Sequence, residues 1–321
     1  MRIPGQKRTR LFYRWLRSRR VGQALILGYH RIAEYRQDPY AICVTPHHFA
    51  EQLAVLRRVA QPISLQRLIE GMQDNNVPKR AVVLTFDDGY ADTLYQAKPL
   101  LERYEIPATV FVTTGYEGRQ FWWDTLEKIL TTPQLPARSE VSLSTPLLGY
   151  LEVDSPATRS QLFWSLYNQL LPLSAPARDQ KLAEIQAWLG NGAGESPVQR
   201  ALTQAELRDL AAGELVTIGA HTVTHPRLAT LSKAEQEVEI RQSKLYLEDV
   251  LAQPVTGFSY PNGSSSETTI SLVRENSFQY ACASHNDVVR AGSNSFQLPR
   301  FWIPDWGEAR FSSWLRRWLP G

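Results

Sequence analysis

The chain has 321 residues, of which 43% are hydrophobic and 21% charged, a balance typical of a globular protein. This composition excludes a disordered chain and a collagen-like fibre. The formal net charge of +3 conceals an asymmetry, because residues 1–20 carry eight Lys and Arg side chains and no acidic one. The rest of the chain carries 27 basic and 32 acidic residues, so we expect no nucleic-acid-binding core.

Cys43 and Cys282 are too few and too far apart for a disulfide framework or a structural zinc site. Residues 1–20 lack the apolar stretch of a signal peptide, and no apolar run has the length of a spanning helix. We therefore expect a cytoplasmic protein. Its basic N-terminal arm, residues 1–20, either contacts the inner face of the membrane or is disordered.

Short apolar runs alternate with helical patterns along most of the chain. Strands are predicted at 24–30, 81–86, 108–112, 216–220, 256–259, 280–283 and around 296–303. Helices are predicted from Pro46, over 93–104, and from Ser232, which forms a capping-box pattern with Glu235. Because this rhythm is typical of parallel βα units with polar residues after the strands, we expect an α/β fold, an incomplete (β/α) barrel.

Residues 116–202 interrupt this rhythm inside the barrel domain, which we place at 21–304. Two helices are predicted in the interruption, over 158–171 and 178–189, which indicates a helical subdomain inserted after the third strand. Residues 305–321 predict an amphipathic helix rich in Trp and Arg. This helix would suit either a membrane surface or the outside of the barrel, and we favour the second.

Two clusters carry the chemistry. Asp87 and Asp88 in "TFDDGY" directly follow a predicted strand, where they either face a common cleft or cap the next helix. His221 and His225 in "HTVTH" are four residues apart, a spacing that places two imidazoles on one face of a helix. An acid from elsewhere in the fold would complete a three-ligand metal site with an open position for water.

The motifs "TFDDGY", "HTVTH" and "YPNG", each at a predicted strand end, resemble those of the polysaccharide deacetylases. This is carbohydrate esterase family four, the NodB-homology domain, and the resemblance covers most of residues 24–115 and 203–304. It implies a distorted (β/α)7-type barrel with one divalent metal, commonly zinc. The implied reaction is hydrolysis of an N-acetyl or O-acetyl group on a glycan or a lipid-linked sugar.

The resemblance also implies roles for individual residues. Asp88, His221 and His225 would bind the metal, and Asp87 would be the general base. From the third motif, the backbone N–H of Asn262 would stabilise the oxyanion. Tyr260 and Pro261 of the same motif would line the substrate site.

The chain departs from the family pattern at two places. Ser259 stands where many members have an arginine that pairs with the base, and Arg300 in "LPRFW" either supplies this charge or is structural. No histidine follows His285, so the late histidine that protonates the leaving amine has no counterpart. His30 in "GYHRI" and His285 are the candidate acids, and we favour His30, although a core histidine is the alternative.

Trp122, Trp123 and Asp124 begin the interruption. The tryptophans either stack on sugar rings or anchor the inserted helices, and Asp124 would either hydrogen-bond the glycan or support the base. Two other functions remain open at this point, a catalytically weak glycan-binding relative and a membrane-associated scaffold built on the basic ends. The presence of Asp87 favours an enzyme, since binding alone needs no base.

Overall fold

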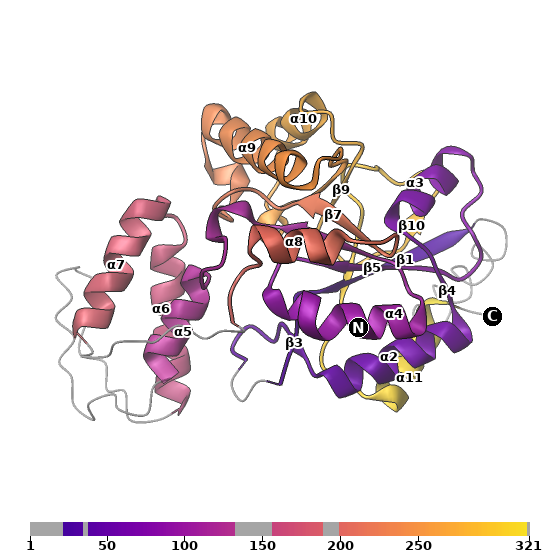
Figure 1. Ribbon diagram of the computed structural model, residues 1–321, viewed down its shortest axis with the longest axis horizontal. Coiled ribbons are helices and arrows are strands. Elements are labelled where there is room, and N and C mark those ends of the chain that lie inside the picture. Colours follow the sequence, from indigo (N-terminus) through magenta and orange to yellow (C-terminus); the bar gives the residue numbers. More distant parts are fainter. Residues whose placement is uncertain (1–21, 35–37, 132–155, 189–198, 320–321) are drawn as a thin grey trace, which may run out of the picture. The chain divides into compact units, whose positions relative to one another are not determined.

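The computed structural model describes residues 22–34, 38–131, 156–188 and 199–319 (Figure 1). The chain forms two compact units, of which the first comprises residues 1–115 and 202–321 and the second residues 116–201. The predicted basic arm at 1–20 lies outside the described residues. Among the described helices, none is long and apolar enough to cross a membrane.

The first unit is built on a curled parallel sheet. Its strands follow one another in the order β1 (Gln23–Tyr29), β5 (Ala81–Phe86), β6 (Ala108–Val112), β7 (Val216–Ala220), β8 (Gly257–Ser259) and β9 (Tyr280–Cys282). Each of these strands falls within about one residue of its predicted position, because buried parallel strands are continuous apolar runs.

One segment closes the sheet. Leu298 pairs with Cys282 of β9, and β11 (Phe301–Trp302) pairs with Leu27 and Gly28 of β1, all in parallel. Residues 298–302 are therefore the seventh parallel member of a ring, which confirms the predicted distorted (β/α)7-type barrel. The seam has few pairs, so the barrel is least regular at this point.

Shorter strands flank the ring. β4 (Gln61–Pro62) pairs in parallel with the start of β5, and β10 (Val289–Arg290) pairs antiparallel with the start of β1. A separate two-stranded ladder joins β2 (Arg31–Ile32) to β3 (Cys43–Val44).

Amphipathic helices cover the strands. They are α2 (Pro46–Val59), α3 (Leu65–Gln73), α4 (Lys98–Tyr104), α8 (Gln204–Ala211), α9 (Lys233–Leu251), α10 (Glu267–Glu275) and α11 (Glu308–Trp318). The predicted capping box of Ser232 and Glu235 is present at the start of α9. The predicted helix over 93–104 is a π-helical turn at Thr93–Ala97 followed by α4, since Pro99 has no N–H for the regular ladder.

The C-terminal helix α11 packs on the barrel. Phe311 and Leu315 are fully buried, and the rings of Phe301 and Trp318 lie 4.4 Å apart between centroids. The helix lies beside α2 (Figure 1). Glu308–Trp318 thus form a helix packed on the barrel, the arrangement that the sequence analysis favours for this segment.

The second unit is helical, with α5 (Trp122–Thr131), α6 (Pro156–Leu170) and α7 (Ala175–Trp188). The two helices predicted in this region are α6 and α7, and α7 begins three residues earlier than predicted. Within the unit, Trp122 stacks on Tyr167 with ring centroids 5.0 Å apart, and the guanidinium of Arg178 lies 4.8 Å above the Trp122 ring.

Candidate metal centre and active site

The two neighbouring acids lie at the end of β5, which stops at Phe86 as predicted. Ala81 and Val83 of this strand belong to one cluster of buried side chains, and Val82 and Leu84 belong to another. Because strand residues alternate between faces, Asp87 continues the row of Ala81, Val83 and Thr85. Asp88 would face the other way, but its φ of +74° turns the chain and redirects its side chain.

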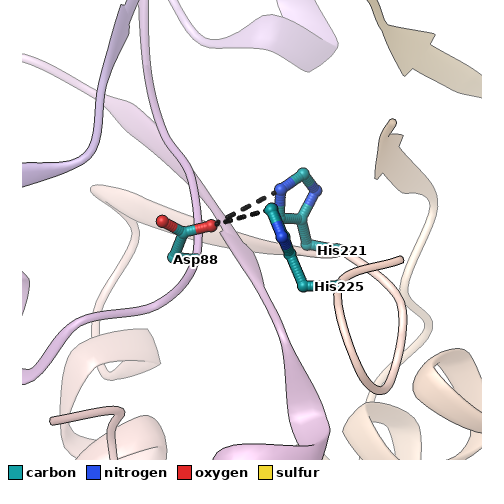
Figure 2. Close-up of side chains that lie close together, drawn as sticks. All are labelled: Asp88, His221 and His225. Carbon is teal, nitrogen blue, oxygen red and sulfur yellow. Dashed lines mark ion pairs between the residues drawn. The ribbon is translucent and has the colours of Figure 1, made fainter. Parts of the chain in front are cut away.

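Asp88, His221 and His225 form a buried cluster whose candidate ligand atoms all lie within 4.8 Å of one another. Oδ1 of Asp88 is 3.6 Å from Nε2 of His221 and 3.4 Å from Nε2 of His225. Figure 2 shows the carboxylate directed at both imidazoles. One carboxylate and two imidazoles suit a divalent transition metal, so this donor set fits the metal that the sequence predicts.

The histidine pair follows β7 as predicted, but it lies in a loop, so helical spacing is not what brings the two imidazoles together. Residues 221–225 form an irregular loop after β7, with φ of +65° at Thr222 and +56° at His225. The imidazoles converge because the loop reverses direction, with their ring centroids 5.0 Å apart. The hydroxyl of Thr222 accepts a hydrogen bond from the backbone N–H of His225 at 3.1 Å and closes the turn.

One hydrogen bond determines which nitrogen of His221 is available as a ligand. Nδ1 of His221 lies 2.7 Å from the carbonyl oxygen of Ser259. A carbonyl oxygen only accepts, so Nδ1 carries the proton and Nε2, which faces Asp88, presents its lone pair. Burial lowers the pKa of His221, which keeps the imidazole neutral as a metal ligand requires.

Asp87 belongs to a different arrangement. Arg300 donates to both of its carboxylate oxygens, from Nη1 at 2.7 Å and from Nη2 at 2.8 Å. Ser259 bridges the pair, because its hydroxyl donates to Asp87 at 3.1 Å and accepts from Arg300 at 2.9 Å. Arg300 thus pairs with Asp87, the contact that many family members make through an arginine at the position of Ser259.

This buried pair controls the ionisation of both partners. Burial raises the pKa of Asp87, but the charge and the hydrogen bonds of Arg300 outweigh burial and hold this pKa well below its usual range. Burial lowers the pKa of Arg300, and Asp87 more than offsets this. Asp87 is therefore an ionised carboxylate at neutral pH, 3.7 Å from Nε2 of His221.

His30 directly follows β1 and is half-buried. Its ring stacks on Trp302 with centroids 4.4 Å apart, and the guanidinium of Arg300 lies 4.6 Å above the same indole. Burial lowers the pKa of His30 to about 4, although the charge of Asp87 raises it in part. The structure thus brings His30 to the neighbourhood of Asp87, whereas His285 is exposed in the loop after β9.

The third motif forms a tight turn after β8. Asn262 has a φ of +55° in the turn Pro261–Gly263, and its side chain is exposed. Tyr260 is 1% exposed, packs on Phe258, and donates its hydroxyl to the carbonyl of Phe296 at 3.0 Å. The ring of Tyr260 therefore packs in the core, and the side chain of Pro261 is buried as well. The substrate role of both residues stays a prediction.

The tryptophans of the inserted unit pack among its own aromatic residues. Trp123 stacks on Phe121 with centroids 4.7 Å apart, and Trp122 has Tyr167 and Arg178 against its ring. Asp124 is 4% exposed. This packing favours the interpretation that the tryptophans hold the inserted helices together, and the substrate role of all three residues stays a prediction.

Two contributors have no separate role in the sequence prediction. Asp92, the third acid of "TFDDGYAD", binds Nε of Arg31 at 2.9 Å and the backbone N–H of Ile32 at 3.2 Å, which fixes the chain after His30. Trp302 connects His30 to Arg300. Asp92 lies in "TFDDGYAD", its partner Arg31 in "GYHRI" and Trp302 in "LPRFW", but their contacts join segments far apart in the chain.

Comparison with known proteins identifies the family. Residues 74–135 and 184–281, which contain Asp87, Asp88 and both histidines, match the family model described as "Polysaccharide deacetylase". The chain belongs to the polysaccharide deacetylase family. The matched residues leave out His30 and Arg300, so these two residues extend the site beyond the family match.

The curated relatives match over a limited part of the chain. A poly-beta-1,6-N-acetyl-D-glucosamine N-deacetylase of Staphylococcus aureus is 30% identical over 111 residues, which cover 30% of this chain and 38% of the relative. The enzyme of the same name from Escherichia coli is 32% identical over 84 residues, covering 26% of this chain and 12% of the relative. The chain thus spans well under half the length of either relative.

Solved structures show the same fold over nearly the whole chain. IcaB from Ammonifex degensii superposes with a TM-score of 0.61 at 17% identity, covering 92% of this chain and 97% of that one. Streptococcus pyogenes deacetylase PplD, in complex with acetate, gives a TM-score of 0.57 at 21% identity, covering 88% and 93%.

Proposed function

We propose that this protein is a metal-dependent deacetylase that hydrolyses N-acetyl groups on a glycan. The arrangement of the two acids carries the proposal. Asp88 faces two imidazoles at metal-ligand spacing, while the neighbouring Asp87 is held beside this cluster by Arg300. A site for binding alone has no use for a buried, ionised carboxylate positioned next to the metal.

The metal would be held by Asp88, His221 and His225, and when bound it would acidify a water molecule and polarise the acetyl carbonyl. Zinc suits the donor set, and another divalent transition metal would also fit. Asp87 is the proton acceptor, since its carboxylate is ionised at neutral pH and fixed in orientation by two hydrogen bonds from Arg300. The backbone N–H of Asn262, in the turn that follows Ser259, donates to the developing oxyanion.

His30 passes a proton to the leaving amine in this proposal. With a pKa of about 4 it is neutral at pH 7, so it must first receive the proton that it later gives up. Asp87, whose charge acts on His30, would supply that proton after taking it from the attacking water. The stacking on Trp302 keeps the imidazole in place between the two transfers.

The substrate class is inferred from the relatives. We propose poly-β-1,6-N-acetylglucosamine or a related N-acetylated saccharide, lipid-linked or polymeric, because two relatives are named for that activity. Hydrolysis of O-acetyl groups, with a sugar hydroxyl as the leaving group, is the alternative reaction at the same site. A location in the cytoplasm, with the basic ends at the inner membrane face, rests on the sequence alone and stays a prediction.

Metal content and acetate release test the proposal together. We expect the purified chain to bind about one divalent metal ion and to release acetate from N-acetylglucosamine oligomers. Asp88→Ala should lose both properties, whereas Asp87→Asn should keep the metal and lose acetate release. Acetate release that persists after complete metal removal would refute the mechanism. Saccharide binding without acetate release by the metal-loaded chain would instead support the glycan-binding alternative.

A further inference from the structure

The loop that carries the two histidines is held in an unfavourable backbone conformation. Thr222 and His225 both have positive φ, at +65° and +56°. This region is costly for residues other than glycine, and most of all for a β-branched residue such as Thr222. The loop therefore needs support from neighbouring elements to keep His225 turned toward Asp88.

The end of β6 supports one side of this loop. The N–H of His221 donates to the carbonyl of Val112 at 2.9 Å, which continues the pairing of β6 with β7. The N–H groups of Thr114 and Gly115 then donate to the carbonyls of Thr222 and Val223, at 3.1 Å and 2.7 Å. These contacts satisfy carbonyl groups of the loop and leave its N–H groups to be satisfied elsewhere.

Glu239, in the second turn of α9, binds the other side. Its Oε2 accepts from the N–H groups of both Val223 and Thr224 at 2.8 Å, and its Oε1 accepts from the Thr224 hydroxyl at 2.6 Å. Successive N–H groups in such a turn form a concave site for an anion. A carboxylate in that site makes charge-assisted hydrogen bonds, which are stronger than neutral ones.

We propose that Glu239 is a positioning residue for the metal centre, which fixes the loop so that His225 meets Asp88 and His221. Thr224 is the immediate neighbour of His225, so a loop released from Glu239 would turn the imidazole away from the other two ligands. The inference rests on the proposed function, because it assumes that this cluster binds a metal. It adds a residue 14 positions beyond the "HTVTH" motif to the metal centre.

Glu239 is not needed to keep α9 in place. Ile240 and Leu247 of this helix are fully buried, and Gln236 bonds to Leu231 and Thr269. Replacing Glu239 therefore changes the loop while the helix stays packed. Glu237, on the same helix, bonds to Asn276 of the neighbouring helix end and does not contact the loop, so it provides a matched control.

The test is the zinc affinity of the full chain, measured by competition with a chromophoric chelator. We expect Glu239→Ala to bind zinc about 10- to 100-fold more weakly than the wild type. This is the usual range when a residue that orients a metal ligand through hydrogen bonds is removed. Glu239→Gln keeps one oxygen for the two backbone N–H groups, so its zinc affinity should lie between those of Glu239→Ala and the wild type. Glu237→Ala should bind zinc as tightly as the wild type.

Amide hydrogen exchange in the metal-free chain gives a second, independent measurement. In Glu239→Ala we expect faster exchange at Val223 and Thr224, with the amides of the middle of α9 unchanged. If Glu239→Ala binds zinc as tightly as Glu237→Ala, the positioning role is wrong while the proposed function stands. A wild-type chain that binds no divalent metal would overturn both.

Discussion

The buried pair of Asp87 and Arg300 makes the most quantitative prediction. In Arg300→Met the apolar side chain fills much of the space, but the carboxylate of Asp87, 3% exposed, loses its cation. The carbonyl of Ala283 and the hydroxyl of Ser259 lose their donor as well. Removing one partner of a buried ion pair destabilises a protein by about 3–5 kcal/mol, and we expect a loss of this size.

Arg58→Met is the matched control. Arg58 contacts Glu308 at 2.7 Å, the same distance as Arg300 to Asp87, but the side chains of Arg58 and Glu308 are both more than half exposed. Exposed pairs contribute about 0–1 kcal/mol, so the contrast between the two variants isolates the effect of burial. The double variant Asp87→Asn/Arg300→Met, which removes both charges of this pair, should recover most of the stability.

The assay is urea unfolding of the metal-free chain, followed by tryptophan fluorescence. The destabilisation by Arg300→Met should shrink as the pH falls. Without the guanidinium, burial raises the pKa of Asp87, so the variant escapes the buried charge by taking up a proton. If Arg300→Met and Arg58→Met lose equal stability at pH 7, the guanidinium does not hold Asp87 in its ionised form, and this reasoning fails.

Three further predictions concern the surroundings of the pair. Because the pKa of His30 is lowered to about 4, the unfolded chain binds more protons than the folded chain below pH 6.5. The free energy of unfolding of the metal-free protein should therefore fall by up to roughly 3 kcal/mol between pH 6.5 and 4. His30→Phe should remove much of this loss, and an unchanged pH dependence would contradict the lowered pKa. Ser259→Ala keeps the backbone carbonyl that orients His221, so we expect unchanged zinc affinity. It removes the hydroxyl that donates to Asp87, so we expect a stability loss of about 1 kcal/mol in urea unfolding. A large loss of zinc affinity would contradict this assignment. In Gly28→Ala the new Cβ would lie 2.6 Å from the Trp302 ring. We expect the free energy of unfolding to fall by about 1–3 kcal/mol and acetate release to slow, while metal binding stays intact. Wild-type activity would show that the stacking of Trp302 on His30 does not matter.

The sequence by itself determined the strands and the candidate metal ligands. The apolar runs at 81–86, 108–112 and 216–220 coincide with β5, β6 and β7, because strands buried on both faces need apolar residues at every position. Asp88, His221 and His225 were identified from the motifs "TFDDGY" and "HTVTH" and their resemblance to the polysaccharide deacetylases, and the structure brings the three side chains together. These features are local, so the order of residues is enough to reveal them.

Only the tertiary structure decided how the site is held together. Asp87 and Arg300 are 213 positions apart, and the closure of the barrel by residues 298–302 brings them into contact. The histidines converge in a loop that is hydrogen-bonded to the end of β6 and to Glu239, and not through helical spacing. Local sequence cannot reveal such contacts, because their free energy comes from desolvated charges and hydrogen bonds between segments that meet only after folding.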